Sequence, residues 1–214
     1  MISIRSQLER TRRERGLTLL ELVVVVAILA ILAGFIIPLA AGQIEKGKTT
    51  ATQANLVLIR DAIMGTADKP GFYTDTGLFP STLRDLFINP FASTDPLATF
   101  NRDTGRGWHG PYVVPSGSTY PSNFTSTYTA GDPAILDAWG HPIVIQIANQ
   151  TTSVGTYPSA NAANLAFIRL VSAGPNGVVD TPQNALDTNG NPYPVSSSRG
   201  DDLVLFINHS DSNP

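Results

Sequence analysis

The longest apolar run of the chain lies near its N-terminus. Between Leu22 and Ala41 there are twenty residues without a charged side chain. At about 1.5 Å of rise per residue, a helix of this length crosses a bilayer core of roughly 30 Å. The pattern therefore predicts a membrane-spanning helix over residues 17–41. Residues 1–16 carry five Arg and two Glu, and a basic flank keeps that end in the cytoplasm. We expect the rest of the chain on the far side.

Two residues of this stretch are not needed by a plain membrane anchor. Glu21 places a carboxylate among Leu and Val side chains, where an unpaired charge is costly, so a partner is expected for it. Pro38 lacks an N–H group and predicts a kink near the far end of the helix. The alternatives are a generic signal anchor with an incidental Glu and a cleaved secretory signal. The apolar core is too long for the second alternative.

After the apolar run, the pattern becomes amphipathic over residues 42–65. A predicted core stripe follows helical spacing, and polar residues occupy the other side. The stripe comprises Ala51, Asn55, Leu58 and Ala62, with Ile59 and Ile63 beside it; the polar side comprises Lys46, Thr49, Gln53 and Arg60. The helix is therefore expected to leave the membrane and present one face to a packed domain.

The remainder, residues 66–214, predicts one globular domain of α+β class. Ser81 is a candidate N-cap for a short helix that ends before Asn89-Pro90. Residues 115–129 are rich in Ser, Thr, Tyr and Asn, and predict a surface loop. Short apolar runs at 143–148, 165–172 and 203–207 predict the strands of a small antiparallel sheet.

Composition narrows the function classes. The chain has no Cys, 14% charged residues and a net charge of −3. No basic patch follows the apolar run, which argues against nucleic acid as a partner. The three His residues show no metal-ligand spacing, and the chain carries no phosphate-binding glycine loop and no hydrolase nucleophile motif. An enzyme is therefore not indicated.

Two segments rich in Gly, Asn and Asp flank the last predicted loop, at residues 172–180 and 199–202. Carboxylate, amide and carbonyl oxygens in a flexible loop are the ligands that Ca²⁺ prefers, at roughly 2.3–2.6 Å. The same residue types also favour turns without any metal. The residues alone leave both interpretations open.

The sequence from Gly16 to Glu21, Gly-Leu-Thr-Leu-Leu-Glu after a basic leader, resembles the class III signal of type IV pilins and pseudopilins. The resemblance implies that residues 1–16 are a leader removed by a prepilin peptidase, which cuts after Gly16 and methylates Leu17. Leu17 departs from the usual Phe. Glu21 then matches the family's glutamate, which compensates the amino-terminal charge of a neighbouring subunit in a filament, and Pro38 matches its helix-kink position.

Three further segments make the resemblance more specific. Gly77 to Leu86, Arg106 to Val113 and Asp137 to Pro142 are similar, in the same order, to segments of type II secretion major (G-type) pseudopilins. Ala138 and Ile143 depart from the last of these. The resemblance implies a pilin-like α+β fold in which the long N-terminal helix packs on the sheet.

The same resemblance implies a structural subunit that self-associates into a periplasmic pseudopilus driving secretion of folded proteins. Its implied partners are minor pseudopilins, the prepilin peptidase, an inner-membrane assembly platform and an outer-membrane secretin. Before assembly the chain would be a single-pass inner-membrane protein with a periplasmic domain. The alternative is a type IV pilin of a surface filament used for adhesion, motility or DNA uptake.

In G-type pseudopilins a calcium loop of the pattern Ser-x-Gly-x-Asp-Gly…Gly-Asp-Asp precedes the last strand. The resemblance implies that three side chains and two backbone carbonyls of this chain are calcium ligands. The implied side-chain ligands are Asn176, Asp201 and Asp202, and the implied carbonyls are those of Ala173 and Val178. Asn176 stands where the family has Asp, the loop is longer, and Asp180 is a candidate for the missing charge.

Overall fold

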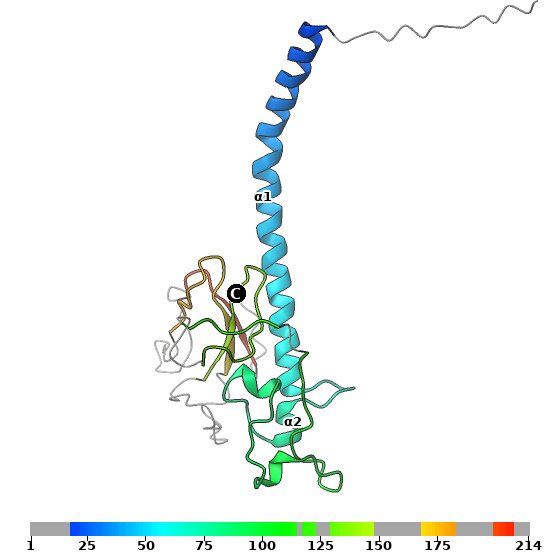
Figure 1. Ribbon diagram of the computed structural model, residues 1–214, viewed down its shortest axis with the longest axis vertical. Coiled ribbons are helices and arrows are strands. Elements are labelled where there is room, and N and C mark those ends of the chain that lie inside the picture. The colour runs from blue at the N-terminus through cyan, green and yellow to red at the C-terminus, as the bar shows by residue number, and fades with distance from the viewer. Residues whose placement is uncertain (1–17, 115–116, 123–128, 148–167, 183–198, 208–214) are drawn as a thin grey trace, which may run out of the picture. The chain divides into compact units, whose positions relative to one another are not determined.

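The structure, a computed structural model, describes residues 18–114, 117–122, 129–147, 168–182 and 199–207, with only the backbone described at 36–41. Figure 1 shows a long helix followed by short helices and a small sheet. The elements are α1 (Leu19–Met64), α2 (Phe72–Thr76), the 3-10 helices η1 (Leu83–Leu86) and η2 (Pro96–Ala98), and strands β1 (Ile143–Gln146), β2 (Arg169–Ser172) and β3 (Leu203–Phe206).

The chain divides into two compact units, Met1–Glu45 and Lys46–Pro214. In the first unit, the side chain of Thr18 caps α1 by accepting a hydrogen bond from the N–H group of Glu21 at 3.2 Å. The large apolar side chains from Leu19 to Phe35 are 47–81% exposed. Among the described residues, no helix is both long and apolar enough to cross a membrane, so the span predicted over 17–41 is not confirmed. The kink predicted at Pro38 falls where side chains are not described.

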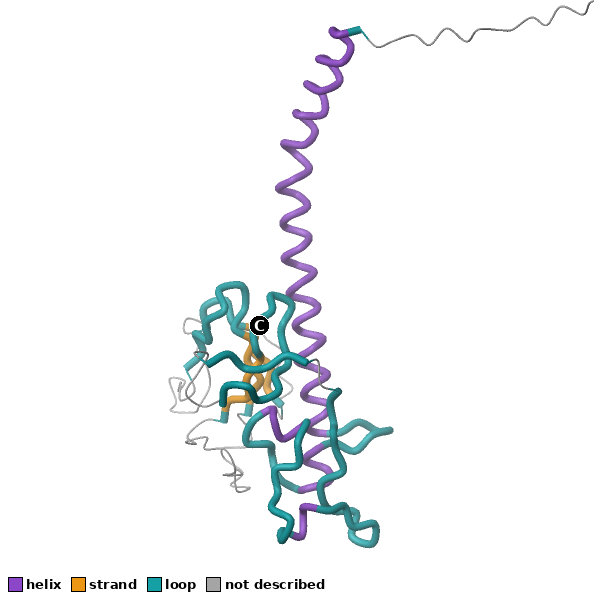
Figure 2. Tube along the Cα trace, viewed as in Figure 1, coloured by secondary structure: helices purple, strands orange, loops and turns teal. Residues whose placement is uncertain are grey.

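The second unit contains the sheet, whose strands are orange in Figure 2. The sheet is antiparallel, with the strand order β1-β2-β3. Ser172 lies opposite both Ile143 and Leu203, and Arg169 lies opposite both Gln146 and Phe206. The α+β class is confirmed, as are the described parts of the three predicted strands. Residues 148 and 165–167 of the predicted strands lie outside the described residues.

One face of the sheet forms the main core with α1. Leu56, Ile59 and Ile63 of the helix pack in one cluster with alternate strand residues, Ile143, Ile145 and Leu170 among them. The predicted helix stripe is confirmed at Ile59 and Ile63, which are fully buried, and wrong at Ala51 and Leu58, which are exposed. Thr52 and Leu56 are buried, whereas Leu58 is 53% exposed. Residues 56–59 are all apolar, so the pattern did not settle which side faces the sheet.

The other face of the sheet carries a second, smaller cluster. Tyr120 and Ala134 cover Val144 of β1 and Val171 of β2. Tyr120 is buried, and its hydroxyl donates to the carbonyl of Ile143 at 2.6 Å. The prediction that residues 115–129 form only a surface loop is therefore wrong at Tyr120, because this aromatic ring anchors the segment to the sheet.

The short helix predicted near residue 81 is a single 3-10 turn, η1. Its N-cap is Thr82 rather than Ser81. The Asp85 carboxylate accepts hydrogen bonds from both the N–H and the hydroxyl of Ser81, each at 2.8 Å. Burial raises the pKa of Asp85, and these hydrogen bonds oppose the rise. The segment is thus held by a buried carboxylate.

Candidate cation-binding loop

The loop after β2 and the residues before β3 meet at one end of the sheet. β2 ends at Ser172 and β3 begins at Leu203, and these two residues are opposite each other in the antiparallel register. Asp201 and Asp202 come directly before β3. They therefore lie beside the loop that leaves β2, although the two segments are far apart in sequence.

Three carboxylates gather at this end. One oxygen from each of Asp180, Asp201 and Asp202 lies within 4.8 Å of the others. Hard oxygen ligands at this separation suit Ca²⁺, which accepts six to eight of them in flexible geometry. The structure thus brings together the three acidic residues that were predicted as ligands.

Asn176 lies between these carboxylates. Its backbone N–H donates to Asp201 Oδ2 at 2.9 Å, and its side-chain amide donates to Asp180 Oδ2 at 2.8 Å. Its own Oδ1 accepts the N–H of Val178 at 2.6 Å. In this arrangement Asn176 braces the carboxylates, and its amide oxygen is engaged within the loop.

Two glycines allow the segments to approach. Gly174 and Gly200 both have positive φ, at 61° and 57°. A Cβ at Gly174 would collide with the carbonyl oxygen of Asp201, and one at Gly200 would collide with the Asp180 carboxylate.

Of the two predicted carbonyl ligands, Ala173 is a fully buried residue and Val178 is an exposed one.

The two carboxylate oxygens of Asp202 differ in their hydrogen bonding. Its Oδ2 accepts the N–H of Thr181 at 2.7 Å. Its Oδ1 is buried and has no hydrogen-bond partner among the described residues. Burial raises the pKa of Asp202, hydrogen bonds from Thr181 offset part of the rise, and the charge of Asp180 adds to it. A cation at this point would supply what Oδ1 lacks.

The turn from Asp137 to Pro142, directly before β1, is hydrogen-bonded to the end of β2 and to the loop that follows it. Asp137 Oδ1 accepts the N–H groups of Trp139 and His141, at 2.9 and 2.8 Å, and its Oδ2 accepts the Ser172 hydroxyl at 2.7 Å. His141 Nδ1 lies 2.8 Å from the carbonyl oxygen of Gly174. Sequence reasoning identified this turn only as a family motif, and its contacts with the loop have no signal in the local pattern.

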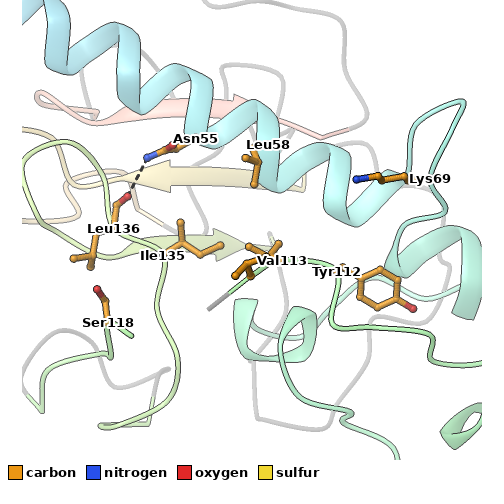
Figure 3. A pocket seen from close by; sticks show the side chains of 9 residues that line it. Asn55, Leu58, Lys69, Tyr112, Val113, Ser118, Ile135 and Leu136 are labelled. Atoms are coloured by element: carbon orange, nitrogen blue, oxygen red, sulfur yellow. Dashed lines mark hydrogen bonds between the residues drawn. The ribbon is translucent and has the colours of Figure 1, made fainter. Parts of the chain in front are cut away.

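A groove of about 570 Å³ lies elsewhere in the second unit, along α1 (Figure 3). Its walls are mainly apolar. They comprise Asn55, Leu58, Lys69, Tyr112, Val113, Val114, Ser118, Ile135 and Leu136. Ser118 and Lys69 are present, but the described residues of the lining include no His or carboxylate, so they do not assemble the Ser, His and acid set of a hydrolase.

At the N-terminus, the predicted cleavage site between Gly16 and Leu17 lies outside the described residues. Glu21 lies in the first turn of α1 and is exposed. A carboxylate in the first turn is favoured by the helix dipole.

Comparisons with known proteins agree with these features. The family described as the prokaryotic N-terminal methylation motif matches residues 11–37. A Vibrio cholerae protein named type II secretion system core protein G is 30% identical over 98 residues, which is 46% of this chain and 63% of that protein. A Xanthomonas campestris protein of the same name is 26% identical over 125 residues, 58% of this chain and 75% of that protein. No solved structure matches.

The chain therefore spans slightly less than two thirds of the Vibrio relative. The matched motif contains the Gly16 to Glu21 signal, and the similarity to two core G proteins agrees with the resemblance drawn from the segments in the globular part. The predicted resemblance is confirmed: this chain carries the prokaryotic N-terminal methylation motif and is similar to the type II secretion system core protein G.

Proposed function

We propose that this chain is a structural subunit that polymerises into a periplasmic pseudopilus and thereby drives type II secretion of folded proteins. The observation that carries the proposal is the N-terminal methylation motif joined, in one chain, to similarity with core protein G. The motif supports leader processing and membrane targeting. The similarity to core protein G supports assignment to type II secretion.

The exposed apolar segment of α1 supports self-association. Large Leu, Val, Ile and Phe side chains between Leu19 and Phe35 are about half exposed or more. An apolar surface of this length is not left in water, because soluble proteins rarely expose large contiguous apolar patches. In the proposal it lies in the inner membrane before assembly and packs against equivalent helices in the filament afterwards.

Processing and register follow from the N-terminus. Cleavage after Gly16 would create an ammonium group at Leu17, and Glu21 of a neighbouring subunit would pair with it inside the helix bundle. A paired charge in such surroundings fixes register, whereas an unpaired one is costly. The partners in this proposal are the prepilin peptidase, minor pseudopilins, the assembly platform and the secretin.

The cation-binding loop would act as a brace of the globular part. Asp180, Asp201 and Asp202 fit Ca²⁺ because three carboxylates converge and one oxygen of Asp202 is buried without a partner among the described residues. When bound, Ca²⁺ would neutralise the mutual repulsion of the carboxylates and join the β2 loop to the start of β3. The chain's own contribution is to hold these oxygens together.

The test is assembly in cells that carry the peptidase and the assembly platform. Wild-type chain should lose its leader, which mass spectrometry of the N-terminus detects, and should appear in sheared or periplasmic filaments by immunolabelling. Glu21→Ala should be processed normally yet assemble more slowly. Wild-type chain that is neither processed nor polymerised would refute the proposal. Normal assembly of Glu21→Ala would refute only the pairing.

A further inference from the structure

A buried arginine lies on the sheet face that points away from α1. Arg169 of β2 has no exposed surface, and it lies directly opposite Gln146 of β1, which is also buried. Burial lowers the pKa of Arg169 to about 10, and the nearby charge of Arg199 adds to the fall. A buried cation needs hydrogen-bond acceptors. The acceptors of Arg169 therefore identify the segment that its side chain fixes in place.

The two side chains grip two consecutive backbone carbonyls. Arg169 donates through Nε to Gln146 Oε1 at 2.9 Å and through Nη2 to the carbonyl of Pro182 at 2.7 Å. Gln146 donates through Nε2 to the carbonyl of Thr181 at 2.9 Å. Thr181 is buried and Pro182 is exposed. Both belong to an irregular segment, where a buried carbonyl must find its donor outside regular secondary structure. We call Gln146 and Arg169 the carbonyl clamp.

The clamped segment is continuous with the candidate calcium ligands. Thr181 directly follows Asp180 in the chain. The same Thr181 whose carbonyl is held by Gln146 donates its N–H to Asp202 Oδ2 at 2.7 Å. On the other side of Asp180, Val179 packs against the cluster on this sheet face. Asp180 is therefore tied to the sheet through both of its neighbours, and Asp202 through Thr181.

We propose that Gln146 and Arg169 are positioning residues for the calcium site. Neither is a ligand in the proposed site. They fix the backbone at 181–182 so that the Asp180 and Asp202 carboxylates converge with that of Asp201. The inference rests on the calcium binding proposed above. Residues that orient metal ligands in this way typically change metal affinity about 10–100-fold when they are removed.

A purely structural role makes a different prediction. Apolar residues at the two opposed positions would pack across the strands at least as well as a buried polar pair. They would remove the side-chain donors of the two carbonyls, and that loss falls on the calcium loop rather than on the α1 core. The clamp should therefore show itself in calcium affinity more than in the stability of the calcium-free chain.

The experiment uses the full chain purified in detergent, with CaCl₂ as the probe. Calcium affinity is measured by titration calorimetry, and the melting temperature is measured in EDTA and in excess CaCl₂. Gln146→Leu should weaken calcium binding about 10–100-fold and reduce the calcium-dependent rise in melting temperature. Tyr120→Phe is the matched control, since it removes a buried hydrogen bond to β1 on the same sheet face. It should lower both melting temperatures equally and leave calcium affinity unchanged.

Arg169→Lys provides a second variant if Gln146→Leu does not fold. It keeps the charge, but an ammonium cannot reproduce the separate Nε and Nη2 contacts, so affinity should fall in the same way. If the wild type binds Ca²⁺ and a folded clamp variant binds it with the same affinity, the clamp is overturned but the calcium site is not. A wild-type chain that binds no Ca²⁺ would overturn the calcium site and the clamp with it.

Discussion

The sharpest test of the acidic cluster replaces one carboxylate by its neutral isostere, Asp202→Asn. One carboxylate oxygen of Asp202 lies within 4.8 Å of an oxygen of both Asp180 and Asp201. Asn keeps the shape and can still accept the N–H of Thr181. Its amide group would take the place of the buried Oδ1 that has no hydrogen-bond partner among the described residues.

The size of the effect follows from the geometry. The carboxylate oxygens lie within 4.8 Å of one another, and a like-charge pair at this upper limit costs about 0.9 kcal/mol at a water-like dielectric. Two pairs involve Asp202. Because Asp180 and Asp201 are exposed, solvent screening keeps the total near 1–2 kcal/mol. Without calcium, Asp202→Asn should therefore melt roughly 2–8 °C above wild type at neutral pH.

The pH dependence has a definite sign. The folded-state pKa of Asp202 is raised above the ordinary value of 3.8, so folding disfavours its charged form. The destabilisation is fully present above the raised pKa and disappears as pH falls below 3.8. The advantage of Asp202→Asn should therefore shrink on acidification. Calcium binding by wild type should weaken over the same range, because the ligand must be deprotonated.

The assay is thermal unfolding in EDTA and in CaCl₂, from acidic to neutral pH. In excess CaCl₂ the order should reverse, with wild type more stable than Asp202→Asn. Asp103→Asn, an exposed carboxylate outside the cluster, is the control and should show neither effect. The reasoning is refuted if Asp202→Asn is less stable than wild type in EDTA, or if CaCl₂ stabilises both proteins equally.

Three other predictions follow from the fold. Ile59→Ala, at a fully buried position, should lower the unfolding free energy by about 2–5 kcal/mol, whereas Leu58→Ala should cost less than about 1 kcal/mol; equal costs in urea titrations would contradict the face assigned to α1. Asp137→Ala removes three hydrogen bonds and should cost about 1–3 kcal/mol while weakening calcium binding; unchanged urea midpoints would rule this out. Glu21→Ala should leave leader removal intact and slow filament growth, as measured by pelleting.

Local patterns predicted the elements but not all of their faces. The long helix and the described parts of the three strands were evident from hydropathy and β-branched runs. The buried side of α1 was not, because apolar residues at 56–59 surround the helix at that level. Tyr120 was missed for a related reason. One aromatic residue in a polar loop carries no periodicity, and only the tertiary fold shows that it anchors the segment.

The acidic cluster was predicted through resemblance rather than through spacing. Asp180 and Asp201 are separated by 20 intervening residues, and only the antiparallel register of β2 and β3 brings their segments together. The carbonyl clamp had no sequence signal at all. Arg169 and Gln146 are polar residues in strands, and their partners are backbone carbonyls, which no side-chain motif can mark.

The measurement that tests the central proposal most directly is deletion of the gene in its host, scored for two outputs. These are the extracellular proteome and the filaments on the cell surface. The pseudopilus account predicts that normally secreted proteins accumulate in the periplasm while surface pili remain, and that the wild-type gene restores secretion. Normal secretion with loss of surface filaments would contradict it and would assign the chain to a surface pilus.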